Sequence, residues 1–280
     1  MIVACFCADL NYKPLLEVAF LSFAKNNSGA KVYVLKYDDF CEETLNDISQ
    51  AYNIDLNVNT LLEEALPSKG RFSKAMYGRF HLYDLIEEKK FVYLDCDIIV
   101  NSSLTELFDI NIHQDQIGLV KDIESPILNK IKENLDIDDY YNSGMILFNK
   151  SDEVAFKIKK VIEYLKDNAD SLEYPDQDAI NVIFAKFIYT LPYKFNYMNV
   201  SRNEIKPIIV HYAHHKPWDY LPINYYNYLY FDIIDNNKFN IKPFIKEFSL
   251  SKKFSILLKL LLKEIGVFNF IQKVYWNYVK

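Results

Sequence analysis

Two aspartates separated by one residue, Asp95 and Asp97, carry the clearest chemical signal in this chain. They follow the apolar run at 91–94, which is typical of a strand covered on both faces. In an extended chain, side chains two positions apart point to the same side, so both carboxylates can reach one cation. Ligands also bind at the carboxyl ends of strands in open α/β sheets. The pair therefore indicates a metal site, with an acidic turn that binds nothing as the alternative.

A histidine and a lysine after another apolar run could complete such a site. His211 ends the run at 207–211, and Lys216 follows five positions later. Two carboxylates and one imidazole suit Mn²⁺ better than Ca²⁺. Lys216 could neutralise a phosphate as a point charge. The alternative is an exposed histidine and lysine loop, anchored by the packing of Pro217 and Trp218.

Small polar side chains stand at the start of two further predicted elements. Asn142 and Ser143 precede the apolar run at 144–148, where they could bind sugar hydroxyls or form a turn. Asp176 and Gln177 lie where a helix is expected to begin. Asp176 could therefore serve chemistry or simply cap that helix.

Two other polar groups follow the same logic. Arg79 opens the helix expected before the acidic strand, so it could reach a phosphate or pair with an acid. Asp9, Asn11 and Tyr12 follow the first expected strand, again at a carboxyl end. The Tyr12 ring could stack on a nucleotide base.

The elements that must position these residues follow from hydrophobic periodicity. Apolar runs of four to eight residues alternate with longer amphipathic stretches, which predicts an α/β domain with a mainly parallel sheet. We expect strands at 2–7, 32–36, 54–58, 91–94, 117–121, 144–148 and 207–211. We expect helices at 13–25, 41–52, 73–88, 152–167 and 177–186, with Ser151 as the N-cap of the fourth.

Composition excludes several classes of protein. The net charge of −6 over 280 residues argues against a surface that binds nucleic acid. None of the six glycines forms a dinucleotide fingerprint or a P-loop, so any bound phosphate must be held by a metal or by side chains. The four cysteines form no zinc pattern, and there is no signal peptide or apolar stretch of about 18 residues. We therefore expect a reduced, cytoplasmic protein.

The last thirty residues differ in charge from the rest. Residues 251–280 hold six lysines and one acid, Glu264. On a helix, Lys252, Lys259 and Lys263 would fall within roughly 40° of one another, opposite an apolar face. We expect this helix to lie on an anionic inner membrane, beside a lipid-linked acceptor. The alternative is a helix that packs on the domain. The predicted division is a catalytic domain at 1–220 and an aromatic, basic region at 221–280.

Six short motifs, in this order, resemble glycosyltransferase family 8, in particular its members that build bacterial lipooligosaccharides. They are Ala8–Tyr12, Tyr77–Arg79, Tyr93–Asp97, Asn142–Gly144, Asp176–Asp178, and His211 with Lys216–Trp218. The similarity runs from residue 2 to about residue 220. It implies a single nucleotide-sugar transferase domain of the glycosyltransferase A type, a mainly parallel mixed sheet flanked by helices. A small helical region would follow at the C-terminus.

The resemblance also implies a retaining reaction with a UDP-hexose donor, galactose or glucose, and Mn²⁺, with Mg²⁺ as the alternative ion. It implies these roles: Asp95, Asp97 and His211 as metal ligands; Asp9, Asn11 and Tyr12 on the uridine; Arg79, Asp122, Asn142 and Ser143 around the donor sugar; Cys96 within the donor site; Asp176 and Gln177 at the anomeric carbon; and Lys216 on the diphosphate. The family usually has six steps from the histidine to the lysine, with a glycine halfway. This chain has five steps and no glycine, which departs from the family at the backbone contact to the diphosphate.

The expected chemistry leaves three alternatives to transfer onto a separate acceptor. The transition state should resemble an oxocarbenium ion, which oxygens from Gln177 and Asp176 would stabilise. Since no nucleophile stands out, we favour front-face attack, with the leaving phosphate taking the acceptor's proton. The alternatives are a metal-dependent UDP-sugar hydrolase, a nucleotide-sugar-binding protein without activity, and a self-glucosylating protein similar to glycogenin.

Overall fold

The computed structural model describes residues 1–61, 77–123, 125, 127–201, 204–219, 224–244, 249–251 and 253. Its elements are β1 (Val3–Ala8), η1 (Leu10–Tyr12), α1 (Lys13–Asn26), β2 (Lys31–Lys36), α2 (Glu43–Tyr52), β3 (Asp55–Thr60), α3 (Gly78–Leu85), β4 (Lys90–Leu94), β5 (Ile98–Val100), α4 (Thr105–Asp109), β6 (Ile117–Lys121), α5 (Leu128–Leu135), β7 (Tyr141–Asn149), α6 (Asp152–Asn168), α7 (Pro175–Phe184), β8 (Ile188–Thr190), η3 (Tyr193–Phe195), β9 (Ile209–His211) and α8 (Asn227–Asp235). The chain forms two compact units, 1–217 with 223–243, and 218–222 with 244–280. The sheets described next belong to the first unit.

The main sheet has seven strands in the order β3-β2-β1-β4-β7-β6-β8. β3, β2, β1 and β4 are mutually parallel, and β8 is parallel to β6. β7 pairs antiparallel with both of its neighbours, β4 and β6. The expected mainly parallel mixed sheet is therefore confirmed, with β7 as the reversed strand among those described.

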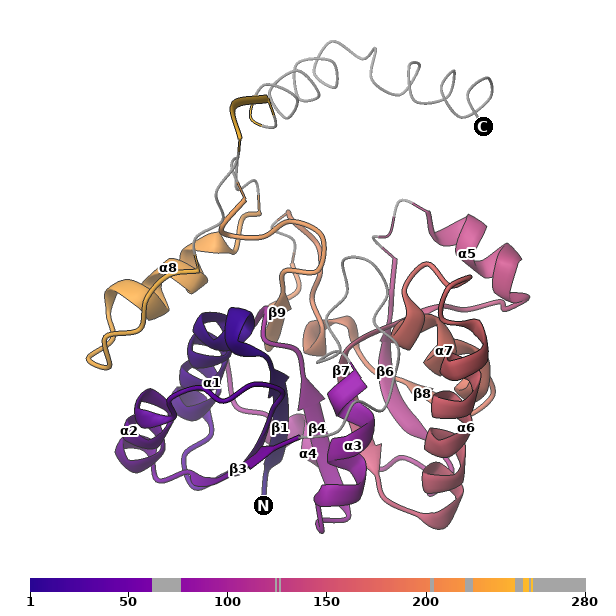
Figure 1. Ribbon diagram of the computed structural model, residues 1–280, viewed down its shortest axis with the longest axis horizontal. Helices are drawn as coiled ribbons and strands as arrows, with labels where there is room; N and C mark the ends of the chain where they lie inside the picture. The colour runs from indigo at the N-terminus through magenta and orange to yellow at the C-terminus, as the bar shows by residue number, and fades with distance from the viewer. Residues whose placement is uncertain are drawn as a thin grey trace. The chain divides into compact units, whose positions relative to one another are not determined.

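Helices cover both faces of this sheet, as Figure 1 shows. On one face, α3, α6 and α7 contribute Tyr83, Ile158 and Phe184 to a buried core that also contains Phe91 and Phe148. On the other face, α1 packs its aromatic side chains edge-on against Phe6 of β1. Because β1 is covered on both sides, all six of its residues are buried.

The reversal of β7 brings distant motifs to one edge of the sheet. The carboxyl ends of β1, β4 and β6 lie at this edge because these strands run in the same direction. The amino-terminal end of β7 lies there too, since β7 runs the opposite way. A short second sheet, β5 paired antiparallel with β9, joins Ile98 to His211. The residues that follow β1, β4 and β6 therefore lie close to the residues at the start of β7.

All seven expected strands are present with small shifts at their ends, and the five expected helices are found. The helix expected at 73–88 differs most. It ends at Leu85, because Ile86 takes extended backbone and is buried. Residues 73–76 lie outside the described part. The sequence missed the short elements β5, α4, α5 and β8, together with α8.

Two expectations about helix starts have different outcomes. Ser151 caps α6 as expected, its side chain accepting a hydrogen bond from the Val154 backbone N–H. Asp176 does not cap α7, so that expectation is wrong. Pro175 occupies the first turn and shifts the cap position back to Tyr174. The carboxylate of Asp178 instead accepts the backbone N–H of Tyr174.

Most of the basic tail, residue 252 and residues 254–280, lies outside the described residues. The expected tail helix therefore stays a prediction. Within the part of the chain that the structure describes, no helix is both long enough and apolar enough to cross a membrane.

Candidate active site

A cavity of about 510 Å³ opens at the edge of the sheet where the motifs meet. Most of the residues that the sequence analysis selected line it: Tyr12, Arg79, Asp95, Cys96, Asp97, Asp122, Asn142, Ser143, Asp176, Gln177, His211 and Lys216. Asp9 and Asn11 are not among the lining residues. The sequence analysis did not select four others that line it: Cys7, Tyr174, Ala213 and His214. A cavity of this size is typical of small-molecule sites.

The three predicted metal ligands converge in this cavity. One side-chain ligand atom from each of Asp95, Asp97 and His211 lies within 4.8 Å of the other two. Their elements explain this: Asp95 follows β4, while the pairing of β5 with β9 holds His211 beside Asp97. The Tyr212 backbone N–H donates to the Asp97 carbonyl at 3.0 Å and continues that pairing.

A cation would find suitable donors here. Two carboxylates and an imidazole suit Mn²⁺, and such a set also admits Mg²⁺. The carboxylates already attract positive side chains, since Arg79 pairs with Asp95 and Lys216 with Asp97. The residues present therefore fit the ion that the resemblance implies.

The surroundings of Asp97 strongly favour its ionised form. Burial alone would raise its pKa, but Lys216 and His211 outweigh that effect and hold the pKa well below its usual range. The His211 Nε2 atom lies 3.2 Å from one Asp97 oxygen, and the Lys216 ammonium donates to the other. The shortened spacing from His211 to Lys216 thus still lets the lysine reach the site.

Gly144 lets β7 approach the predicted metal ligands closely. A Cβ atom built there would lie 2.2 Å from His211 Cε1 and 2.9 Å from Asp95 Oδ2. Real Cβ atoms do not come so near, and the ring is fixed by burial. The Gly144 carbonyl also accepts the Asp95 backbone N–H at 2.8 Å. A side chain at this position would therefore displace the imidazole or the carboxylate.

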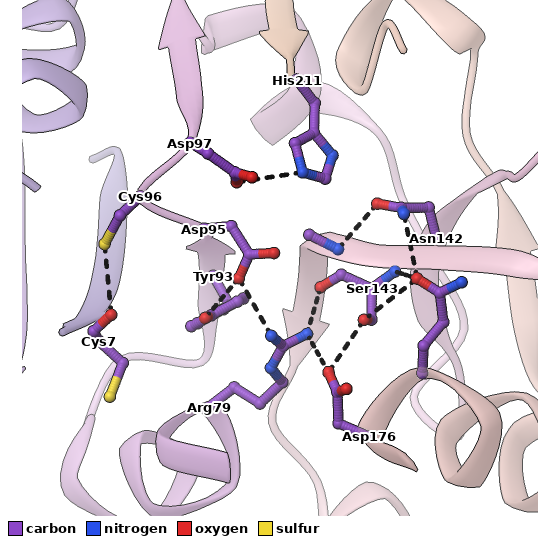
Figure 2. Close-up of polar contacts among 12 residues, drawn as sticks. Cys7, Arg79, Tyr93, Asp95, Cys96, Asp97, Asn142, Ser143, Asp176 and His211 are labelled. Atoms are coloured by element: carbon purple, nitrogen blue, oxygen red, sulfur yellow. Dashed lines mark hydrogen bonds and ion pairs between the residues drawn. The ribbon is translucent and has the colours of Figure 1, made fainter. Parts of the chain in front are cut away.

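Arg79 holds the two halves of the site together, as Figure 2 shows. This guanidinium is 3% exposed and pairs with Asp95 at 3.0 Å and with Asp176 at 2.9 Å. It also donates to the Ser143 carbonyl at 2.6 Å and lies over the Tyr93 ring. Of the two roles that the sequence left open for Arg79, the structure contains the pairing with acids. The side chain is buried and lines the cavity.

Asp176 and Gln177 stand on the first turn of α7, next to the start of β7. Burial raises the pKa of Asp176, and Arg79 opposes this rise. The Ser143 hydroxyl also donates to Asp176, at 3.1 Å. The Gln177 carbonyl oxygen accepts the Ser143 backbone N–H at 3.1 Å and the Asn142 amide at 3.0 Å. The Gln177 side chain is therefore fixed, with its NH₂ group 3.5 Å from Asp122.

His214 is the most informative residue that sequence reasoning missed. Its Nε2 atom is buried and makes no hydrogen bond within the described part of the chain. The atom lies 3.9 Å from an Asp122 carboxylate oxygen. Burial lowers the pKa of His214, although Asp122 opposes this, so the ring is neutral at pH 7. The sequence offered one signal for selecting His214, namely its position between His211 and Lys216.

The first motif contributes through Tyr12, which lines the cavity. The Asp9 carboxylate accepts the Tyr12 backbone N–H at 3.0 Å and so orders the turn after β1. Asn11 is exposed on that turn. Cys96 donates its thiol to the Cys7 carbonyl, and burial raises the pKa of both thiols. These cysteines therefore stay protonated, as expected of buried free thiols.

Comparisons with known proteins agree with this geometry. The sequence profile described as "Glycosyl transferase family 8" matches residues 3–221. General stress protein A of Bacillus subtilis (strain 168) is 26% identical over 268 residues, covering 84% of this chain and 93% of that protein. Lipopolysaccharide 1,2-glucosyltransferase of Escherichia coli (strain K12) is 24% identical over 251 residues, covering 78% of this chain and 74% of that protein.

A solved structure of galactosyltransferase LgtC with donor and acceptor sugar analogs superposes with a TM-score of 0.70. The two are 22% identical, and the match covers 83% of this chain and 95% of that chain. This likeness, together with the sheet topology, confirms the expected fold of the glycosyltransferase A type.

Proposed function

The chain belongs to glycosyl transferase family 8 and is a hexosyltransferase, and we propose that it moves galactose or glucose from a UDP-sugar to a saccharide acceptor with retention of configuration. The observation that supports this most is the convergence of Asp95, Asp97 and His211 within 4.8 Å. They share one cavity with Asp176 and Gln177. Candidate cation ligands and candidate anomeric-carbon contacts thus line the same space, which supports the proposal. The catalytic domain would be residues 1–220.

Departure of the diphosphate is the step in which charge must be neutralised. Asp95, Asp97 and His211 would hold Mn²⁺, or alternatively Mg²⁺, which when bound acts as a Lewis acid on the diphosphate oxygens. Lys216 lies at the same place and would add a second positive charge by moving from Asp97 to the phosphate. On the other side of the donor, Tyr12 would stack on the uracil.

Asp176 suits an electrostatic role beside the anomeric carbon. Its carboxylate is already engaged by the Arg79 guanidinium and the Ser143 hydroxyl, which makes it a weak nucleophile. Its negative charge would still stabilise positive charge that develops on the sugar ring. We therefore favour attack on the front face, with the acceptor's proton passing to the leaving phosphate. Asn142, Ser143 and Asp122 would orient the donor sugar.

The acceptor we propose is a saccharide of lipopolysaccharide or lipooligosaccharide type. Relatives at 24–25% identity are named lipopolysaccharide 1,2-glucosyltransferases, which supports this acceptor class. Such acceptors are lipid-linked during synthesis. The proposed place of action is the cytoplasmic face of the inner membrane, with the basic residues 251–280 on the anionic surface.

Donor turnover with and without acceptor tests this proposal. We expect UDP release from UDP-galactose or UDP-glucose that requires Mn²⁺, and NMR of the first product should show an α-linkage. Asp97→Ala should abolish this turnover while far-UV circular dichroism stays unchanged. A β-linked product would contradict retention, and full activity in Asp97→Ala would contradict the metal role. Turnover without acceptor as the main activity would indicate a hydrolase, and added hexose mass on the protein would indicate self-glucosylation.

A further inference from the structure

Asn196 lies directly behind the predicted metal ligands without lining the cavity. It follows η3, and its exposed fraction is 0%. Its amide joins two residues of the site, because it contacts His211 Nδ1 at 2.9 Å and Asn142 Oδ1 at 2.8 Å. No motif in the sequence marked this residue. Its contacts nevertheless decide which nitrogen of His211 carries a proton.

Asn196 belongs to a chain of hydrogen-bonded side chains, the relay, that runs from His211 through Asn196 and Asn142 to Gln177. Two backbone N–H groups of β7 fix the orientation of the amides at the Gln177 end. The Ser143 N–H can only donate, so Gln177 must present its carbonyl oxygen to it, at 3.1 Å. The Gly144 N–H likewise donates to Asn142, which must present Oδ1, at 2.9 Å. The Asn142 NH₂ group then points to Gln177 and donates to the same Oε1 atom, at 3.0 Å. Both amides are thus oriented by main-chain donors.

The orientation of Asn196 follows from that of Asn142. Since Asn142 presents an oxygen, Asn196 must turn its NH₂ group toward it. Asn196 Oδ1 therefore faces His211. An amide oxygen can only accept, so His211 Nδ1 must carry a proton in this contact.

We propose that Asn196 is a positioning residue that keeps Nδ1 of His211 protonated, so that the Nε2 lone pair is the one available to a cation. The Nε2 atom is the ring nitrogen that points toward Asp97, at 3.2 Å. A ligating histidine needs this lone pair, and its other nitrogen is usually fixed by a neighbouring acceptor. The inference rests on the proposed function for the identity of the cation, but the tautomer itself does not depend on it.

The relay also links the metal ligand to the residue beside the anomeric carbon. It runs from His211 through Asn196 and Asn142 to Gln177, and the hydrogen-bonded atoms are 2.8–3.0 Å apart. All four side chains are buried. Because an unsatisfied buried amide is costly, a change at one member reorients the next. The tautomer is therefore set by the fold of β7.

Nuclear magnetic resonance of the metal-free full-length protein tests the tautomer directly. Histidine labelled with ¹⁵N distinguishes protonated from unprotonated ring nitrogens by chemical shift and by two-bond couplings. The measurement is made with chelator at a pH of about 8, above the ordinary pKa of histidine. The His211 signals are assigned by their loss in His211→Ala. We expect a protonated Nδ1 whether or not Nε2 donates to Asp97 in the metal-free protein, and an unprotonated Nδ1 in the wild type overturns the proposal.

Two substitutions then separate the accepting role of Asn196 from its bulk. Asn196→Leu keeps the approximate volume, removes both hydrogen bonds and excludes water. It should leave His211 Nδ1 without an acceptor, so that neither ring nitrogen is favoured as the site of the proton. It should also weaken Mn²⁺ binding in the presence of UDP about 10–100-fold. Asn196→Asp keeps an acceptor for the Nδ1–H group but loses the amide donor to Asn142, so it should keep Nδ1 protonated and lose less Mn²⁺ affinity than Asn196→Leu. Affinity is measured by calorimetry and by electron paramagnetic resonance of free Mn²⁺.

Asn27→Leu is the matched control, because Asn27 is also buried, donates to the Phe23 carbonyl of α1 and accepts the Leu104 backbone N–H at the start of α4. It should change stability without changing the His211 tautomer or Mn²⁺ affinity. Unchanged Mn²⁺ affinity in Asn196→Leu overturns the proposal, as does equal loss in Asn196→Leu and Asn196→Asp. If Asn196→Leu does not fold, the proposal is still tested by the NMR spectrum of the wild type and by the Mn²⁺ affinity of Asn196→Asp. A wild type with Nδ1–H but no Mn²⁺ binding supports the relay and contradicts the proposed metal role.

Discussion

At the scale of single residues, His214 is a partly buried histidine that lines the cavity with its Nε2 atom buried. Its Nε2 atom is 3.9 Å from Asp122 and has no hydrogen-bond partner within the described part of the chain. Leaving such an atom unpaired is costly, so we expect the bound donor to supply its partner. His214→Ala should raise the KM for the UDP-sugar about tenfold, the loss of roughly one hydrogen bond, with kcat little changed.

The neighbouring His215 provides the control for this prediction, since it is exposed and does not line the cavity. His215→Ala should leave both kinetic constants near their wild-type values. An unchanged KM in His214→Ala, measured by initial rates over a range of donor concentrations, would contradict a donor contact at this position.

Gln177 should act on the chemical step more than on binding. Its amide is oriented by Ser143 and held beside Asp122, so it meets the donor with a fixed dipole. Groups oriented in advance toward a developing charge act mainly in the transition state. Gln177→Ala should lower kcat about 100-fold, while UDP affinity measured by calorimetry falls far less. A change confined to KM would show that Gln177 only binds the donor.

At the scale of secondary-structure elements, the start of β7 must pass very close to the metal ligands. Gly144→Ala would place a Cβ 2.2 Å from the His211 ring and so should abolish Mn²⁺ binding in the presence of UDP. The control is Gly29→Ala. Gly29 has φ +77° with nothing within 4 Å of an added Cβ, so this change costs about 1 kcal/mol of stability and leaves Mn²⁺ binding intact. Calorimetric titration measures Mn²⁺ affinity and thermal unfolding measures stability in each variant. Wild-type Mn²⁺ affinity in Gly144→Ala would contradict the close approach of β7 to His211.

The long elements could be predicted because their burial leaves a pattern in the sequence. The apolar run before Asp95 indicated a covered strand, and β4 is that strand. The three-residue strand β5 was missed, since Ile98, Ile99 and Val100 are too few residues to show a periodic pattern. The cap of α7 was misassigned because the helix begins two residues earlier than expected, with Pro175 in its first turn, which the capping pattern does not reveal.

The candidate site was predicted from residues that carry charge or stand in motifs. Asp95, Asp97 and His211 do meet, although 114 positions separate the last two. Asn196 was missed because its partners His211 and Asn142 are 15 and 54 residues away and nothing local distinguishes it. Asp9 and Asn11 were expected on the uridine and are not among the residues that line the cavity, so their contact with a donor stays a prediction. Contacts between side chains distant in sequence are the part that only the fold supplies.

At the scale of the whole molecule, charge is distributed unevenly along the chain. Residues 251–280 carry six lysines and one acid, a net charge of +5, so the rest carries −6 − 5 = −11. An acidic body repels both an anionic donor and an anionic membrane. Binding of the proposed donor would therefore depend on local cations such as Lys216, and the proposed attraction to a membrane would come from the tail.

The full-length protein should therefore bind anionic liposomes through its tail and should not bind neutral ones. Each lysine near an anionic surface contributes about 1 kcal/mol, so Lys252, Lys259 and Lys263 changed together to Gln should weaken binding roughly 100-fold. The control is an equal charge change at exposed lysines of the catalytic unit, namely Lys159, Lys166 and Lys186. Liposome co-sedimentation measures binding, and turnover of a soluble acceptor should be unaffected in both variants.

Deletion of residues 251–280 should also abolish liposome binding and spare turnover. A truncated protein that unfolds or aggregates would instead mean that the tail packs into the core and that the membrane proposal is wrong.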